Sequence, residues 1–421
     1  MTGSITLPGD KSISHRYAMI GALAEGDTSI ANFSTGADCR STVECVRALG
    51  IEVAGAATEL VIHGKGLDGL RAPVCDLDAG NSGSTIRMLS GILAGQPFSS
   101  RILGDESLSR RPMKRVMTPL GQMGAHIEAR DGQFPPLRIE GRTLRAIDYT
   151  LPVPSAQVKT CVLFAGLYAG GATTVTEPVR SRDHTEIALR EFGAEVAVER
   201  RRITIAGRPR LRGRQLVVPS DLSSAAFFLV AALLVPGSRL GISGVGLNPT
   251  RSALLDFLAG MGACIRVPKL ESQAGELVGD LEVEYSELRG GTIDGPLTAA
   301  LIDEIPALAV LGAATREGLT VRGAGELRIK ETDRIRMVVD NLRRMGVEAE
   351  ELPDGMAIPG RQKFRAAALD SSGDHRIAMA FAVAALAADG ESEIAGADAA
   401  SVSFPEFWDT LASVTQPRPR E

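Results

Sequence analysis

Apolar positions along the chain follow a repeating order of helix and strand. A stretch with helical spacing ends in alanines and a glycine, and a short run of β-prone residues follows it. This junction occurs six times, marked by Gly26, Gly95, Gly171, Gly237, Gly318 and Gly390, and successive markers lie 66 to 81 residues apart. The spacing therefore predicts six structural units of about 70 residues each.

A second junction alternates with the first. A hydrophobic residue and a glycine close a helix and an alternating strand follows, in LGIEV at 49, MGAHIEA at 123, FGAEVAV at 192, MGACIRV at 261 and MGVEAE at 345. Glycine just after a helix favours the left-handed cap. Each unit is thus predicted to run strand, helix, strand, helix and further paired strands, which makes the protein α/β.

The second junction has five copies and the first has six. The strand SITLP, which starts at residue 4, can supply the missing copy. The first residues would then pair with the C-terminal half, and the chain would cross between two domains near residue 10 and near residue 220. A length of 421 residues also favours two domains, because one core rarely serves so long a chain.

Composition limits the classes of molecule and the compartment that suit this protein. A net charge of -5 and an aromatic content of 4% argue against nucleic-acid binding, which needs a basic face and stacking rings. Five scattered cysteines without paired spacing predict reduced thiols and no zinc site. The apolar run 225–235 is too short to span a bilayer and predicts a buried helix. Without a basic, apolar leader, we expect a cytoplasmic protein with no membrane partner.

The peptide PGDKSISHR, residues 8–16, carries the densest candidate chemistry. The cationic and hydroxyl side chains that follow its Pro-Gly turn are Lys11, Ser12, Ser14, His15 and Arg16. Lys11 and Ser12 can open a helix whose free N–H groups attract phosphate. Asp10 stands where a Walker A loop requires glycine, which argues against a nucleotide triphosphatase. The alternative is a solvated turn with ordinary surface charges.

Two further clusters in the N-terminal half suit an anion. In GNSGSTIR, residues 80–87, Gly83 allows close approach to a ligand and Arg87 lies one helical turn further on; a plain helix N-cap is the alternative. In GDESLSRRPMKR, residues 104–115, Arg111 is restrained by Pro112 and offers a bidentate fork to carboxylate or phosphate. A solvated cationic face would look the same in sequence.

Two more clusters precede predicted helices at similar places in successive units. PVPSAQVK, residues 152–159, presents Ser155, Gln157 and Lys159 at the mouth of an apolar helix. RSRDHTE, residues 180–186, places Ser181 and Arg182 at the start of another. Both can be simple caps, but their equivalent positions favour a shared cleft.

The C-terminal half supplies carboxylates among cations. Asp303 and Glu304 adjoin an apolar helix, where partial desolvation would raise a carboxyl pKa and suit a general base; an acidic N-cap is the alternative. In RIKETDRIR, residues 328–336, Lys330 and Arg334 are predicted on one face of one helix, which intrahelical ion pairs also explain. The triplet DHR, residues 374–376, precedes a strongly apolar helix and points its amino end toward a polar cleft.

Together the strings PGDKSISHR, GNSG, RRPM, SAQ, IKETDR and DHR resemble the EPSP synthases, in the family's order and approximate spacing over nearly the whole chain. The resemblance implies an inside-out α/β barrel fold of two domains, built from six βαβαββ repeats. Domain I would comprise residues 1–10 plus 221–421, and domain II residues 11–220, with three repeats each. The active-site cleft would lie between them at a two-stranded hinge, and the domains would close on the substrates.

The resemblance also implies the reaction. The enolpyruvyl group of phosphoenolpyruvate would pass to the 5-hydroxyl of shikimate 3-phosphate, and phosphate would leave through a tetrahedral intermediate, a step of aromatic amino acid biosynthesis. No metal or organic cofactor is needed, because protonation of the enol carbon makes C2 electrophilic. The partners would be these two small molecules only, and the protein would be a monomer.

Residue roles follow from the same motifs. Asp303 would be the base for the 5-hydroxyl, and Glu331, assisted by Lys11, the acid for the methylene carbon. Shikimate 3-phosphate would be bound by Lys11, Ser12, Arg16, Ser155, Ala156, Gln157, Ser181, Arg182, Asp303 and Lys330. Phosphoenolpyruvate would be bound by Lys11, Gly83, Arg111, Gln157, Arg334 and Arg376.

The chain departs from the family pattern at three places. Many members place a Lys ahead of Thr-Phe-Pro, and this Lys is absent from SVSFPEF, residues 401–407. The second Ser of the usual Ser-Ser-Gln is replaced by Ala156. A common Tyr is replaced within SRDHT, where Arg182 can serve the phosphate. These differences leave substrate affinity and the response to glyphosate open, although Gly83 retains room beside phosphoenolpyruvate.

Two alternatives are weighed against this interpretation. UDP-N-acetylglucosamine enolpyruvyl transferase uses a loop Cys as its acid, and the corresponding loop 105–115 contains none. A non-catalytic anion-binding repeat scaffold would not require both Asp303 and Glu331 among the cations.

Overall fold

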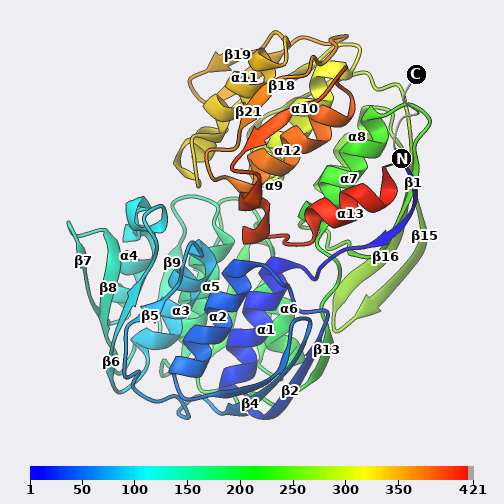
Figure 1. Ribbon diagram of the computed structural model, residues 1–421. Coiled ribbons are helices and arrows are strands. Elements are labelled where there is room, and N and C mark those ends of the chain that lie inside the picture. Colours follow the sequence, from blue (N-terminus) through cyan, green and yellow to red (C-terminus); the bar gives the residue numbers. More distant parts are fainter. Residues whose placement is uncertain (416–421) are drawn as a thin grey trace. The chain divides into compact units, whose positions relative to one another are not determined.

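The computed structural model describes residues 1–415 and is a mixed α/β fold (Figure 1). The chain divides into two compact units. Unit 1 comprises Met1–Pro8, Pro219–Ser272 and the chain from Leu277 onward, and unit 2 comprises Gly9–Val218 and the short segment Gln273–Glu276. Each unit has its own hydrophobic core.

Unit 2 contains three four-stranded sheets and six α-helices within the described residues. Its helices are α1 (Lys11–Leu23), α2 (Ala37–Ala48), α3 (Gly83–Ala94), α4 (Lys114–Gln122), α5 (Ala156–Gly166) and α6 (His184–Glu191), with a 3₁₀ turn η1 (Leu108–Arg110). Its strands are β2 (Glu25–Ala31), β3 (Glu52–Ala56), β4 (Glu59–Lys65), β5 (Leu77–Asp78), β6 (Ser99–Leu103), β7 (His126–Arg130), β8 (Phe134–Glu140), β9 (Asp148–Thr150), β10 (Ala172–Thr176), β11 (Val196–Glu199), β12 (Arg202–Ala206) and β13 (Gln215–Val217).

The three sheets of unit 2 share one pattern. Their strand orders are β13-β2-β4-β3, β5-β6-β8-β7 and β9-β10-β12-β11. In each sheet the first two strands run parallel and the later neighbours antiparallel. The core helices α1, α3 and α5 lie on the inner side of these strands (Figure 1).

Unit 1 repeats the same elements. Its helices are α7 (Leu222–Leu234), α8 (Ala253–Gly260), α9 (Gly295–Ala300), α10 (Ile305–Ala314), α11 (Arg334–Arg344), α12 (His375–Leu386) and α13 (Phe407–Val414), with 3₁₀ turns η2 (Gly325–Ile329) and η3 (Ala397–Val402). Its strands are β1 (Thr2–Thr6), β14 (Arg239–Gly246), β15 (Cys264–Gln273), β16 (Glu276–Glu284), β17 (Gly291–Ile293), β18 (Leu319–Val321), β19 (Glu350–Leu352), β20 (Gly355–Ile358), β21 (Ala368–Asp370) and β22 (Glu393–Ala395).

The sheets of unit 1 are β1-β14-β16-β15, β17-β18-β20-β19 and the pair β21-β22. Strand β1 pairs in parallel with β14, with Ile5 opposite Ile242, so the first residues of the chain complete a sheet of the C-terminal half. Both larger sheets again begin with a parallel pair. The two-stranded sheet is parallel as well.

Helix α7 is buried along its whole length because it is apolar on every face. All residues of α7 are buried, which confirms the buried helix predicted at 225–235. Helices α10 and α12 are nearly as apolar and pack against each other and against α7. Only their ends can then carry polar groups. Within residues 1–415, no helix combines the length and apolarity needed to cross a bilayer.

Candidate active site

The opening peptide forms the start of helix α1, as predicted. The Asp10 carboxylate accepts a hydrogen bond from the Ile13 N–H at 2.9 Å and caps the helix, which begins at Lys11. Gly9 allows the turn before it, because a Cβ at this position would lie 1.8 Å from the Asn32 carbonyl oxygen. Lys11 Nζ lies 3.0 Å from Asp38 Oδ2 at the start of α2.

Arg16 joins the amino ends of three helices. Its Nε donates to the Thr185 hydroxyl in α6 at 2.7 Å, and its Nη2 donates to the Thr160 hydroxyl in α5 at 2.9 Å. Its Nη1 donates to the Ser12 carbonyl in its own helix at 2.8 Å. The side chain is buried, and burial lowers the pKa of Arg16 to about 10. Arg16 therefore remains a cation at neutral pH and has a fixed orientation.

Gln157 connects α5 with α3. Its Nε2 donates to the Ser84 hydroxyl at 2.9 Å, and its Oε1 accepts from Arg87 Nη1 at 2.8 Å. Ser155 is the N-cap of α5, as one of its alternatives predicted, and its hydroxyl accepts from the Val158 N–H at 3.3 Å. The free N–H groups at the start of α5, Ala156 included, thus open beside those of α3.

Gly83 opens α3 and lies against two guanidinium groups. A Cβ at Gly83 would lie 2.7 Å from Arg87 Nη1 and 3.5 Å from Arg111 Nη1. Arg111 has the extended backbone expected before proline, and its Nη2 donates to the Asn81 side chain at 2.7 Å and to the Ser107 hydroxyl at 3.1 Å. An anion at the start of α3 would therefore meet N–H groups and two cations.

Ser181 and Arg182 lie in the segment between β10 and α6. Arg182 Nη1 donates to the Ser12 hydroxyl at 3.3 Å, which places it beside the first turn of α1. Ser181 donates both its backbone N–H, at 3.2 Å, and its hydroxyl to Glu177. The structure thus groups the predicted residues of unit 2 at the amino ends of α1, α3, α5 and α6, where helix dipoles favour negative charge.

The carboxylate cluster of unit 1 is built around Arg334. Its Nε donates to Asp374 Oδ2 at 2.8 Å, and its Nη2 donates to Glu331 Oε2 at 2.6 Å. Its Nη1 lies 3.7 Å from Asp303 Oδ1, and Lys330 Nζ lies 3.9 Å from the same oxygen. Both predicted catalytic carboxylates, Asp303 and Glu331, therefore share one buried guanidinium.

Burial and ion pairing shift the titration of this cluster. Burial alone would lower the pKa of Arg334, but the carboxylates of Asp374 and Glu331 outweigh it and raise the pKa. For Asp374, burial acts to raise the pKa, and the guanidinium of Arg334 overcomes it, so the pKa is lowered. The pair is thus ionised at neutral pH.

The helix predicted over residues 328–336 is wrong. Residues 325–329 form the 3₁₀ turn η2, Lys330 is extended, and α11 begins only at Arg334, capped by the Asp333 carboxylate. Lys330 and Arg334 therefore do not share a helix face. Asp333 competes for the backbone as an N-cap, and it accepts the Arg336 N–H at 3.1 Å, which sets the later start.

The amino ends of α10 and α12 complete the cluster. Glu304 is the N-cap residue of α10, so Asp303 directly precedes this apolar helix, as predicted. Asp374 caps α12 by accepting the Arg376 N–H at 2.9 Å, and Arg376 is buried at the second position of this helix. The predicted position of DHR before the helix is confirmed for Asp374, and His375 opens the helix itself.

Sequence reasoning missed the partners that hold these residues. The sequence patterns do not single out Asp38 or Glu177, they offer Arg87 only as part of an anion-binding cluster, and they indicate Asp374 only as a charged residue before a helix. A buried cation requires a nearby acceptor, and Arg334 is buried while Lys11 is partly buried, so each needs a carboxylate beside it. The positions of those carboxylates, 27 and 40 residues away, leave no local pattern.

A family model described as EPSP synthase (3-phosphoshikimate 1-carboxyvinyltransferase) matches residues 1–411. The chain belongs to the EPSP synthase family. A relative named 3-phosphoshikimate 1-carboxyvinyltransferase from Solibacter usitatus is 75% identical, over 99% of this chain and 98% of that protein. One of the same name from Koribacter versatilis is 55% identical, over 98% and 97%.

A solved EPSP synthase structure from Acinetobacter baumannii superimposes with a TM-score of 0.88 and 41% identity, and the match covers 98% of this chain and 95% of that one. The family assignment confirms the resemblance inferred from the motifs. It also confirms the α/β class of the fold and its likeness to EPSP synthases.

Proposed function

We propose that this EPSP synthase family member transfers the enolpyruvyl group of phosphoenolpyruvate to the 5-hydroxyl of shikimate 3-phosphate. The observation that carries the proposal is the Arg334 cluster, in which Asp303 and Glu331 lie on one buried cation. An addition–elimination needs a base and an acid that hold different protonation states, and carboxylates in different surroundings can do so.

Each proton transfer of the reaction is then assigned to a residue. Asp303 accepts the proton of the 5-hydroxyl as that oxygen bonds to C2 of phosphoenolpyruvate, and Glu331, assisted by Lys11, gives a proton to the methylene carbon. The tetrahedral intermediate next loses phosphate from C2, which takes up the proton held by Asp303, and a proton from the new methyl group returns to Glu331, which leaves the enol ether. The cations need only bind the phosphates and carboxylates of the two substrates.

The residues proposed to bind the substrates lie mostly at or near the amino ends of helices. In unit 2, Lys11, Ser12, Arg16, Ser155, Ala156, Gln157, Ser181 and Arg182 would hold shikimate 3-phosphate, with Asp303 and Lys330 from unit 1. Phosphoenolpyruvate would be held by Lys11, Gly83, Arg111, Gln157, Arg334 and Arg376. The bonds of Arg16 and Gln157 to neighbouring helices support these roles, because they orient both groups before a ligand arrives.

The domain interpretation remains part of the proposal. We retain two domains, residues 1–10 plus 221–421 and residues 11–220, built as an inside-out barrel of six βαβαββ repeats that closes on its substrates. The order of one parallel and two antiparallel neighbours, which recurs in all three sheets of unit 2, supports a repeated unit. We also retain a cytoplasmic monomer that needs no metal or organic cofactor.

The test is phosphate release from phosphoenolpyruvate and shikimate 3-phosphate by the purified protein. Asp303→Asn is expected to lower kcat by about 10²–10⁴-fold, the usual contribution of a general base, while shikimate 3-phosphate still binds. The matched control is Asp294→Asn at the exposed N-cap of α9 in the same unit, which should leave kcat unchanged. Absence of phosphate release by the unmodified protein would refute the function, and near-normal turnover of Asp303→Asn would remove the base.

A further inference from the structure

Three charged side chains of unit 2 are buried together beside the segment 178–183, which contains Ser181 and Arg182, two residues proposed to bind shikimate 3-phosphate. Lys159 Nζ in α5 lies 3.1 Å from Glu177 Oε2, just after β10, and 2.7 Å from Glu186 Oε1 in α6. The side chains are 0%, 2% and 3% exposed. Burying three charges is costly, and apolar side chains of similar volume often stabilise a fold equally well or better. The cluster therefore calls for a role besides stability.

Glu177 differs from Glu186 in what its second oxygen binds. Glu177 Oε1 accepts the backbone N–H of Ser181 at 3.2 Å and also the Ser181 hydroxyl. Glu177 thus ties Lys159 to a non-helical segment whose next residue, Arg182, bonds to Ser12 in α1. Among the described residues, no hydrogen bond reaches Glu186 Oε2.

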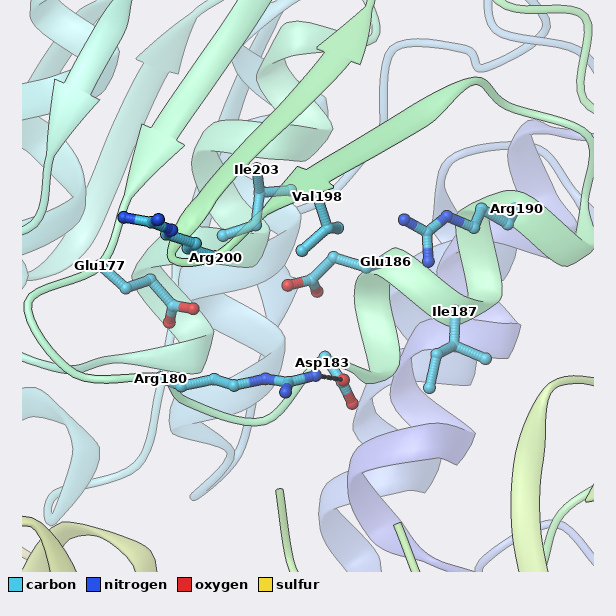
Figure 2. Close-up of a pocket in the computed structure, with 9 residues that line it drawn as sticks. All are labelled: Glu177, Arg180, Asp183, Glu186, Ile187, Arg190, Val198, Arg200 and Ile203. Atoms are coloured by element: carbon cyan, nitrogen blue, oxygen red, sulfur yellow. Dashed lines mark hydrogen bonds and ion pairs between the residues drawn. The ribbon is translucent and has the colours of Figure 1, made fainter. Parts of the chain in front are cut away.

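Figure 2 shows the surroundings of this segment. Glu177 and Glu186 line a small cavity of about 60 Å³, together with Arg180 and Asp183, which are joined by a 2.7 Å ion pair. The hydrogen bond from Ser181 N–H to Glu177 fixes the backbone between Arg180 and Asp183, two residues that line this cavity.

We propose that Glu177, fixed by Lys159, is a positioning residue that places Ser181 for the phosphate of shikimate 3-phosphate. The inference rests on the proposed function. In the structure the Ser181 hydroxyl donates to Glu177. When the phosphate binds, that hydroxyl turns to a phosphate oxygen, while the backbone N–H stays on the carboxylate. Glu177 thereby keeps the hydroxyl in place before the substrate arrives.

The two glutamates form a matched pair for the test. In Glu177→Gln, one end of the side chain becomes a donor, so it cannot accept from both Lys159 and Ser181. In Glu186→Gln, the remaining oxygen still accepts from Lys159, and the new amide takes the place of the oxygen to which no hydrogen bond is made. Burial also raises the pKa of Glu186, even against Lys159. Its neutral amide is thus the milder change.

The experiment measures binding of shikimate 3-phosphate and of shikimate, which lacks the phosphate, by calorimetry, together with kcat from phosphate release. Glu177→Gln should lower the preference for shikimate 3-phosphate over shikimate at least 10-fold and change kcat less than 3-fold. Glu186→Gln should keep the preference within 2-fold. A general loss of structure would weaken both ligands equally, so the ratio isolates positioning.

Glu177→Asp provides a second variant if the amide does not fold. It keeps the charge beside Lys159 but shortens the reach to Ser181, and it should lower the same ratio. If the unmodified protein is active and both Glu177 variants keep the ratio, the positioning role is refuted. If the unmodified protein neither turns over nor binds shikimate 3-phosphate, the proposed function itself fails and the inference falls with it.

Discussion

Asp374→Asn tests how much the negative charge beside the buried Arg334 contributes to the free energy of unfolding. Asp374 is completely buried and receives Nε at 2.8 Å and Nη2 at 3.3 Å. It also caps α12 through the Arg376 N–H. Because Asn is as good an N-cap as Asp, the substitution keeps the cap and removes the charge. The new amide donors would then face the guanidinium donors.

The expected loss of unfolding free energy is about 3 kcal/mol. Removing one partner of a buried ion pair costs about 3–5 kcal/mol, because the other charge stays buried. Glu331, 2.6 Å from Nη2, and Asp303, 3.7 Å from Nη1, still compensate Arg334, so the lower end applies. Asp374→Ala should cost about 1 kcal/mol more, since it also removes the cap.

Urea unfolding measures the loss. The single tryptophan, Trp408 in α13, lies in unit 1 with the ion pair, so its fluorescence reports on the unit concerned. The control is Asp340→Asn, which removes an exposed pair with Arg336 on α11 and should cost less than about 1 kcal/mol. If Asp374→Asn is no more destabilising than Asp340→Asn, removing the charge beside the buried Arg334 carries no large cost, and the reasoning is wrong.

Three further predictions concern unit 2. Gly91→Ala should destabilise the protein by about 1–3 kcal/mol. The new Cβ would lie 2.1 Å from the Cys161 carbonyl oxygen, where α3 meets α5. An unchanged urea midpoint, followed by circular dichroism, would contradict this prediction. Burial, together with the nearby charges of Lys11 and Arg16, lowers the pKa of His15 well below 6.5. The unfolded chain therefore binds this proton more tightly than the folded protein does. The contribution of neutral His15 to stability is complete above pH 6.5 and is lost as the pH falls through the folded pKa. His15→Gln should flatten the stability profile in that window, and an identical profile would argue against a neutral buried imidazole. Lys11→Ala should lower kcat/KM at least about 100-fold through both kcat and KM in the phosphate-release assay, and a change in KM alone would remove Lys11 from the chemistry.

The starts of helices were predictable because capping is local. Ser155 caps α5 within three residues, and the apolar sequence that follows requires burial. Local capping also explains why the helix predicted over residues 328–336 is wrong. The Asp333 side chain caps α11, so the extended stretch ends there and the helix begins at Arg334. The spacing of Lys330 and Arg334 suggests one longer helix instead.

The partners of the site residues were not predictable, because they come from distant parts of the chain. Arg16 meets Thr160 and Thr185, which are 144 and 169 residues away. A hydroxyl residue has no sequence feature that identifies the guanidinium it will contact. Such contacts exist only once the sheets have placed the helix ends side by side.

The sequence by itself determined the class of fold, the repeated junctions, the helix starts and the family, since each depends on residue types at short separations. Only the tertiary structure decided which charges share one buried site. It placed Asp303, Glu331 and Asp374 around Arg334, and it placed Glu177 behind Ser181. The physical reason is that a buried charge is tolerated only beside its partner, and packing across the whole chain fixes that pairing.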